Sequence, residues 1–141
     1  TLMRGYLGET ELERALDGDA WFATGDIGFL DADGDLWVVQ RRSDLIISGG
    51  ENIYPSEIEQ VLREHPAVAE AAVIGLPSPE WGQQVGAALV LHDPTARIDD
   101  ILAFCRTRLA GYKLPRVVRI VAGLPRTASG KLQRASLREL F

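Results

Sequence analysis

Three short polar segments hold the residue types that could do chemistry in this chain. Residues 24–26 (Thr-Gly-Asp) place a carboxylate after a glycine turn, where it could accept hydrogen bonds from a ribose diol. Residues 41–44 (Arg-Arg-Ser-Asp) follow an apolar stretch, and an arginine there could bind a sugar or a phosphate through its planar fork. Residues 127–131 (Thr-Ala-Ser-Gly-Lys) form a polar loop whose lysine could bring a point charge to a reacting centre. Taken singly, each segment also fits a turn, a surface salt bridge or a solvated lysine.

Several other kinds of site find no support in the sequence. The lysine loop lacks the G-x-x-x-x-G-K-[ST] spacing of a P-loop. One cysteine and two histidines cannot supply the usual Cys and His spacings, so neither a metal site nor an internal disulfide is expected. No apolar run reaches the roughly 20 residues of a membrane span, and no basic stretch with an apolar core indicates a signal peptide. The composition suits a reducing cytoplasm.

Charge is distributed unevenly along the 141 residues, whose net charge is -5. Residues 1–105 hold six basic and nineteen acidic residues, whereas residues 106–138 hold nine basic residues and no acidic one. Such a tail attracts polyanions, so a solvated basic surface, a site for nucleotide or coenzyme phosphates, and a nucleic-acid surface all remain open. Nucleic acid is the weakest of these, because Tyr112 is the tail's only aromatic residue and the acidic remainder repels a phosphate backbone.

Hydropathy and turn residues predict the elements that position these segments. Two strands around an Asp-Gly turn are expected over residues 26–40, and a short strand over residues 45–47 ends at Ser48 and two glycines. Adjacent glycines indicate unusual dihedrals or close approach to a ligand. A helix over residues 55–65 begins with a proline and has the Ser56–Glu59 spacing of a capping box.

The second half of the chain predicts a further helix and more strands. Strands are expected over residues 68–76, 84–91 and 117–121, a helix over 98–109, a loop over 123–134 and a short final helix over 134–140. Cys105 lies on the apolar stripe of its helix, which favours a core residue over a nucleophile. This β-α-β-β-α-β order with a small sheet indicates an α+β fold.

Together, in order and spacing, these segments resemble the C-terminal third of acyl- and aryl-CoA ligases of the adenylate-forming superfamily. The matching strings are TGDIGFLDADGDLWVVQRRSDLIISGGENIYPSEIE, VIGLPSPEWGQ, GYKLPRVV and LPRTASGKLQR, and the resemblance extends to residues 3–6. It implies that residues 1–42 are the end of an N-terminal adenylation domain, with a β-hairpin and linker. Residues 43–141 would be a small C-terminal lid domain, a short mixed sheet flanked by helices.

The resemblance also implies a reaction in two steps. A carboxylate attacks the α-phosphate of ATP to give an acyl-adenylate and pyrophosphate; the lid then rotates, and the thiol of coenzyme A gives the acyl-CoA and AMP. ATP, coenzyme A and Mg²⁺ are the implied cofactors, with the Mg²⁺ ligands in the missing N-terminal domain. The Arg-Arg-Ser-Asp-Leu-Ile string with its glycine loop is similar to o-succinylbenzoate–CoA ligases of menaquinone synthesis. A fatty-acyl or aryl-CoA ligase, a domain that loads a carrier protein, and a non-catalytic nucleotide- or CoA-binding module remain alternatives.

Individual residues take roles from this resemblance. Asp26 and Arg41 match residues that contact the ribose, and Lys131 matches the lysine that enters the site for adenylation. Ser43 matches the hinge, where many relatives have Asp or Lys; a hinge requires only a residue that absorbs a large dihedral change.

A second set of residues matches the surface used in the thioester-forming orientation. Gly49 and Gly50 match the loop that lines the pantetheine tunnel, and Trp81 matches a tryptophan beside that tunnel. Tyr112, Lys113 and Arg116 match the segment near the CoA nucleotide. Relatives often carry a basic residue where this chain has Leu114, so one contact is expected to be missing. Trp81 equally fits a core or loop aromatic, and Lys113 and Arg116 equally fit solvated charges.

Overall fold

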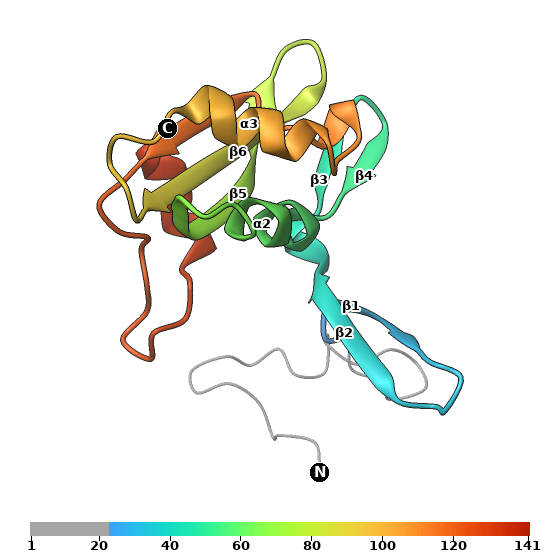
Figure 1. Cartoon of the computed structure of the whole chain (residues 1–141). Coiled ribbons are helices and arrows are strands. Elements are labelled where there is room, and N and C mark those ends of the chain that lie inside the picture. The colour runs from blue at the N-terminus through green and yellow to red at the C-terminus, as the bar shows by residue number, and fades with distance from the viewer. Residues whose placement is uncertain (1–22) are drawn as a thin grey trace. The chain divides into compact units, whose positions relative to one another are not determined.

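The computed structural model describes residues 23–141 (Figure 1). These residues divide between two units, one that ends at Ser43 and a second, Asp44–Phe141. The described part of the first unit is an antiparallel hairpin of β1 (Asp26–Leu30) and β2 (Leu36–Arg41). The short 3-10 helix η1 (Arg42–Asp44) follows at the junction of the units. No helix in residues 23–141 has the length and apolar character needed to cross a bilayer.

The β1–β2 turn forms where the Asp-Gly pair predicts it. Gly34 adopts a positive φ of 87°, and the Asp31 carboxylate accepts hydrogen bonds from the backbone amides of Asp33 and Asp35 at 3.1 and 2.9 Å. The Trp37 indole also donates to Asp31, at 2.6 Å, and this bond is the main reason that the pKa of the Asp31 carboxyl lies below its usual value. A charged acceptor thus organises the whole turn.

A five-stranded mixed sheet forms the centre of the second unit. Its strands are β3 (Ile46–Ser48), β4 (Glu51–Ile53), β5 (Val68–Ser78), β6 (Gly82–Leu91) and β7 (Val117–Ile120). β5 and β6 make a long antiparallel pair, and β7 runs parallel to β6 on its other edge. β3 joins the start of β6 through the pairing of Ser48 with Gly82. The predicted small mixed sheet of an α+β domain is therefore confirmed.

The sequence did not predict β4, although it did indicate unusual dihedrals at the two glycines before it. Gly49 and Gly50 have φ values of 58° and 86°, and β4 folds back on β3 to form a tight hairpin. A two-residue turn with positive φ at both positions matches the twist of the flanking strands. Residues 51–53 contain only one apolar residue, so they carry no alternating pattern from which a strand could be predicted.

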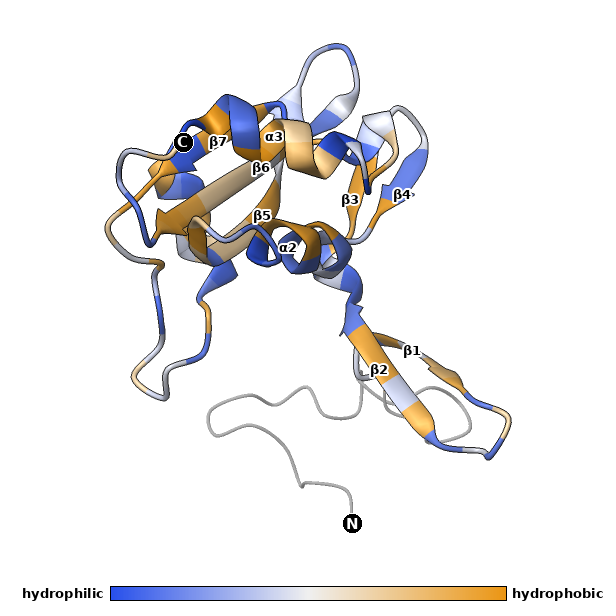
Figure 2. Cartoon of the chain, in the orientation of Figure 1, coloured by the Kyte–Doolittle hydropathy of each residue, from blue (hydrophilic) through white to orange (hydrophobic). Residues whose placement is uncertain are grey.

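Two helices, α2 (Pro55–Arg63) and α3 (Ile98–Arg106), cover one face of this sheet. Ile58 and Leu62 of α2 and Ile101 and Cys105 of α3 are fully buried in one cluster with residues of β5 and β6. Figure 2 shows hydrophobic residues along β5 and β6 and polar residues alternating with apolar ones around both helices. The core position predicted for Cys105 is confirmed, and burial raises the pKa of its thiol.

The opposite face of the sheet is covered by the C-terminal segment. The 3-10 helix η3 (Arg134–Leu140) buries Leu137 against Ala72, Ile74 and Leu76 of β5. Side chains alternate between the two faces of a strand, so β5 contributes to both clusters. β5, which pairs only with β6 among the described strands, is therefore packed on both of its faces.

The capping box predicted at Ser56 and Glu59 is wrong. Tyr54 is the N-cap residue of α2 and makes no side-chain cap, while Pro55 takes the first helical position as expected. Glu59 instead points inward, where it is 6% exposed and accepts a 2.9 Å hydrogen bond from the backbone amide of Val73. A buried carboxylate needs strong partners, and the side chain of Arg134 supplies them.

Candidate functional site

Asp26 and Arg41, expected to contact a ribose, are brought together by the register of the hairpin. They are opposite each other in the β1–β2 ladder, and the Arg41 Nε lies 3.2 Å from the Asp26 Oδ1. The Thr24 hydroxyl accepts a hydrogen bond from the Asp26 amide at 3.1 Å. The Asp26 side chain is 31% exposed, so its carboxylate can accept hydrogen bonds from hydroxyl groups while Arg41 holds it in place.

Ser43, expected to be the hinge, is the last residue of the first unit. It lies exposed within η1, between β2 and the sheet of the second unit. The junction of the two compact units thus falls at the position where the sequence places the hinge. Its role in a domain rotation stays a prediction.

The loop that carries Lys131 is built by its own hydrogen bonds. Arg126 and Leu132 form an isolated antiparallel bridge, and the Thr127 amide donates to the Lys131 carbonyl at 2.8 Å. The Thr127 hydroxyl accepts from the Lys131 amide at 3.2 Å, and Gly130 closes the turn with a φ of 82°. The Gly130 amide donates to the Thr127 carbonyl at 2.9 Å. The loop therefore has a defined shape, which presents Lys131 beside its glycine.

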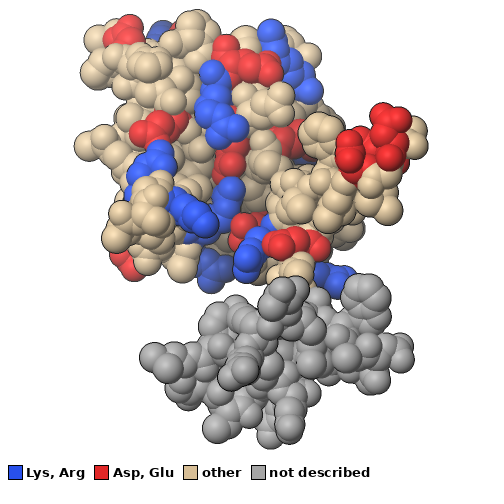
Figure 3. Space-filling view, turned by 90° about the horizontal axis from the view of Figure 1, so that it is seen from below, with Lys and Arg blue, Asp and Glu red and all other residues tan. Residues whose placement is uncertain are grey.

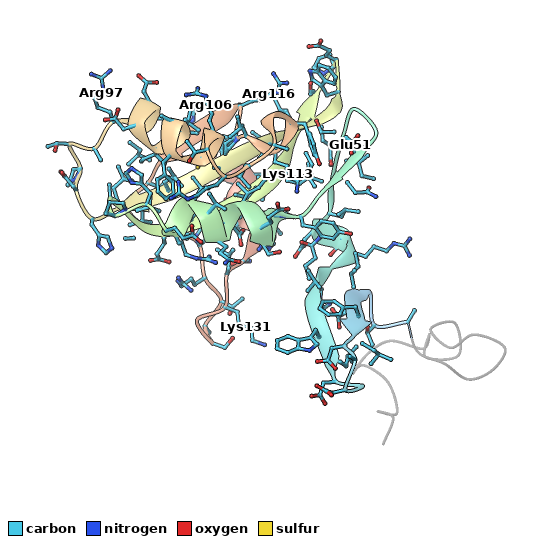
Figure 4. All side chains as sticks on the ribbon, turned by 45° about the vertical axis from the view of Figure 1, so that its right-hand side comes forward. Glu51, Arg97, Arg106, Lys113, Arg116 and Lys131 are labelled. Atoms are coloured by element: carbon cyan, nitrogen blue, oxygen red, sulfur yellow. The ribbon has the colours of Figure 1, made fainter. Side chains whose placement is uncertain are left out.

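Lys131 is exposed at the tip of this loop (Figure 4). Its side chain makes no hydrogen bond or ion pair with any residue in the described part of the chain, 23–141. An ammonium group presented in this way can approach an anion without first giving up a protein partner.

The charge of the basic tail is partly neutralised in the folded protein. Four of its nine basic residues form ion pairs with acidic residues from positions 44–70: Arg108 with Glu64, Lys113 with Glu57, Arg126 with Glu70, and Arg134 with Glu59 and Asp44. Seen from below, basic and acidic side chains lie interspersed over this unit (Figure 3). The sequence asymmetry thus does not make a uniformly basic surface, which further weakens the nucleic-acid alternative.

Gly49, Trp81 and Arg116, expected on the coenzyme side, lie together. The Gly49 amide donates to the Trp81 carbonyl at 3.0 Å, and a Cβ placed on Gly49 would lie 2.8 Å from the Trp81 ring. The Arg116 guanidinium lies 5.5 Å from the centroid of that ring. Trp81 is 39% exposed, so it is a loop aromatic stacked on the glycine turn and not a core residue. Gly50, next in the turn, faces open space.

Tyr112 and Lys113 belong to the 3-10 helix η2 (Gly111–Lys113). Tyr112 is 44% exposed, but the Lys113 ammonium lies 2.7 Å from both carboxylate oxygens of Glu57 on α2. The reading of Lys113 as a solvated charge is therefore wrong, because its side chain is only 19% exposed and is paired. Lys131 and Arg116 lie at opposite ends of the second unit (Figure 4).

We expect the Lys113–Glu57 pair to stabilise the fold in a pH-dependent way. The hydrogen bond to Glu57 is the main cause that raises the pKa of Lys113 above its ordinary 10.5. Its contribution is therefore fully present below pH 10.5 and is lost as the pH rises through the folded-state pKa. Glu57→Gln should lower the free energy of unfolding by less than about 1 kcal/mol at pH 7, because Glu57 is partly exposed.

Urea unfolding at pH 7 and at pH 11 tests this pair. The difference between wild type and Glu57→Gln should shrink at the higher pH, whereas Glu80→Gln, in an exposed loop, should show no difference at either pH. A Glu57→Gln effect that grows with pH would contradict the assignment.

The paired carboxylates are the site residues that sequence reasoning missed. Glu57, Glu59 and Glu70 each pair with a basic residue at least 56 positions away, so local spacing carries no signal for them. No group of three side chains able to ligate a metal gathers in residues 23–141.

Comparison with known proteins adds a family and close relatives. Residues 57–131 match the family described as AMP-binding enzyme C-terminal domain. The chain is 53% identical over 135 residues to a 2-succinylbenzoate–CoA ligase of Listeria monocytogenes, a match that covers 96% of this chain and 29% of the relative. The chain thus spans less than a third of the length of this curated relative.

Solved structures give the same picture. The o-succinylbenzoate CoA synthetase from Bacillus subtilis, in complex with the acyl-adenylate intermediate OSB-AMP, superposes with a TM-score of 0.82 and 49% identity. ATP-bound MatB from Rhodopseudomonas palustris gives a TM-score of 0.85 and 38% identity. Each match covers 92% of this chain and 26% of the solved chain.

Proposed function

Because the chain belongs to the family of AMP-binding enzyme C-terminal domains, we propose that it is the C-terminal part of an ATP-dependent acid–CoA ligase. In the whole enzyme a carboxylate and ATP give an acyl-adenylate and pyrophosphate, and coenzyme A then gives the acyl-CoA and AMP. The observation that carries the proposal is the ammonium of Lys131, which has no ion-pair or hydrogen-bond partner in residues 23–141 and lies at the tip of a hydrogen-bonded loop. Residues 43–141 are the lid, and residues 1–42 end the N-terminal adenylation domain.

Lys131 acts in the first step. A carboxylate and a phosphate, both anionic, must come together there, and negative charge builds up around the α-phosphate. A preorganised ammonium offsets that charge and holds the two groups in a reactive orientation. Because Lys131 has no partner in the described residues, its full charge is available for this task.

Asp26 and Arg41 hold the nucleotide by its ribose. The Asp26 carboxylate accepts hydrogen bonds from the two hydroxyl groups, and Arg41 fixes the carboxylate and donates to the sugar. The exposed apolar side chains of this hairpin, Phe29, Leu30, Leu36, Trp37 and Val38, agree with its place at the end of a larger domain.

The second step uses the opposite end of the lid. The Gly49–Gly50 turn with Trp81 borders the passage for the pantetheine arm, and Tyr112 and Arg116 lie where they can contact the CoA nucleotide. Lys113 can join them only by releasing Glu57. A rotation of the lid about Ser43 would bring first the Lys131 end and then the Gly49–Trp81 end to the same active centre.

The proposed acid substrate is o-succinylbenzoate. The reaction would belong to menaquinone synthesis, and we propose that it takes place in the cytoplasm. The relative and the solved synthetase carry this acid in their names and are 53% and 49% identical to this chain. Because the acyl pocket lies outside these residues, fatty and aryl acids and carrier-bound pantetheine are the alternatives. Mg²⁺ would neutralise the triphosphate, and we propose that its ligands lie in the N-terminal domain.

The full-length protein tests this proposal. We expect AMP release with o-succinylbenzoate, ATP, Mg²⁺ and coenzyme A, and pyrophosphate exchange without coenzyme A. A panel of fatty and aromatic acids, and a pantetheinyl carrier protein in place of coenzyme A, separates the alternatives. The absence of AMP release with every acid and both acceptors would refute a ligase and favour a binding module.

The 141-residue chain on its own should show no ligase activity. Lys131 would then have no bound acid or phosphate to act on, because both groups bind to the N-terminal domain. Purified chain, assayed for AMP release with ATP, coenzyme A and the same acids, should give the rate of buffer alone. Turnover by this material would contradict the domain assignment.

A further inference from the structure

Arg134 binds an acidic residue of α2, a backbone carbonyl of β5 and an acidic residue at the junction of the units. Its Nη1 lies 2.7 Å from Glu59 Oε1 and donates to the Val73 carbonyl at 3.0 Å, and its Nη2 lies 3.1 Å from Glu59 Oε2. Its Nε lies 3.2 Å from the Asp44 Oδ2. All three guanidinium nitrogens are therefore engaged, in a fork geometry that only arginine provides.

The acidic partners of Arg134 lie at the junction of the two units and in the core of the second unit. Asp44 directly follows Ser43, at the junction of the two units. Glu59 is buried on α2 and is already fixed by the Val73 amide of strand β5. Arg134 itself lies three positions after Lys131, where the lysine loop enters η3. One side chain thus links the loop, the core and the junction.

The base of this loop is only partly packed, because Leu124 and Leu132 contact the cluster around Leu137 but also border open space. A pocket of about 360 Å³ lies there, and Leu124 and Leu132 are the apolar residues that the loop segment contributes to its lining. The other strand of the loop is tied by Arg126, which pairs with Glu70 and donates to the Gly130 carbonyl at 2.9 Å. That pair is exposed, with side chains 48% and 39% accessible, whereas Glu59 is only 7% accessible. Arg134 is therefore the firmer of the two anchors.

We propose that Arg134 is a positioning residue that holds the Lys131 loop at a fixed place relative to Asp44 and the adjoining hinge. This inference rests on the proposed function and assigns a role within it to a side chain that touches no substrate. When the lid turns about Ser43, the Arg134 fork makes the loop turn with it as one body. The ammonium then arrives at a defined position, which adenylation requires and thioester formation does not.

The experiment uses the full-length protein with Arg134→Lys and Asp44→Asn. Both variants leave Glu59 a cationic partner, so neither buries an unpaired charge. Arg138→Lys, an exposed arginine of the same helix η3, is the matched control. We expect Arg134→Lys to lower kcat of adenylation by about tenfold to a hundredfold, with KM for ATP little changed. Thioester formation from supplied acyl-adenylate should stay at the wild-type rate, and Asp44→Asn should give a smaller loss in adenylation alone.

A measurement that needs no activity accompanies the kinetics. Hydrogen exchange at the amides of Thr127, Gly130, Lys131 and Gln133, all hydrogen-bonded in the loop, should be faster in Arg134→Lys than in Arg138→Lys. Equal loss in both half-reactions, or unchanged exchange in the loop, would overturn the positioning role. A wild-type protein that does not adenylate any acid would refute the proposed function, and the exchange data would still decide whether Arg134 holds the loop.

Discussion

Lys131→Ala in the full-length enzyme is expected to slow adenylation by about 10²- to 10³-fold, the usual cost of removing one preorganised charge or donor from a transition state. Thioester formation from supplied acyl-adenylate should be largely unaffected, because Lys131 and the Gly49–Trp81–Arg116 cluster lie at different ends of the lid. The fold should survive, since the Lys131 side chain has no partner to lose within the described residues.

Pyrophosphate exchange measures the first half-reaction, and release of AMP from synthetic acyl-adenylate with coenzyme A measures the second. Arg119→Ala is the control, because it removes an exposed cation of the same tail from β7. A similar loss in both half-reactions for Lys131→Ala would remove the lysine from its proposed role.

Gly49→Ala is expected to have the converse effect. The new Cβ would lie 2.8 Å from the Trp81 ring, and φ at this position is 58°. The ring or the turn must move, which displaces the side of the lid assigned to the pantetheine arm. Because an ångström of displacement can cost two orders of magnitude, we expect thioester formation to slow by about tenfold to a hundredfold, with adenylation preserved.

Gly50→Ala is a matched control for this prediction. Gly50 also has a positive φ, 86°, but a Cβ there meets nothing within 4 Å. Both variants carry backbone strain, and only Gly49→Ala pushes on Trp81. If the two variants slow thioester formation equally, strain in the turn and not the position of Trp81 explains the loss.

The sequence predicts well those features that depend on neighbouring residues. The Asp-Gly turn of the hairpin, the apolar stripes of α2 and α3 and the positive φ values at Gly49 and Gly50 all follow from local patterns. The pairing of Asp26 with Arg41 does not follow from the turn alone. The register at the turn would place Asp26 opposite Gln40, and a one-residue shift between Ile27 and Gly28 places it opposite Arg41.

Features that depend on distant residues could not be predicted in this way. Glu59 has the spacing of a capping residue, yet the cost of leaving Arg134 without a partner near the core draws it inward. The sequence around Lys113 fits a solvated charge, but in the fold α2 places Glu57 beside its ammonium group. The net positive charge of residues 106–138 likewise does not predict the charge of the surface they form, because their acidic partners come from another part of the chain.

The two-sided burial of β5 has a mechanical consequence for the lid. A strand fixed by helices on one face and by η3 on the other cannot bend without breaking two cores at once. The Lys131 loop and the Gly49–Gly50 turn therefore lie at two ends of one rigid unit, and the sheet sets the distance between them. In the proposed function, only a rotation of this whole unit about Ser43 would exchange the end that faces the active centre, so we expect the two half-reactions to alternate.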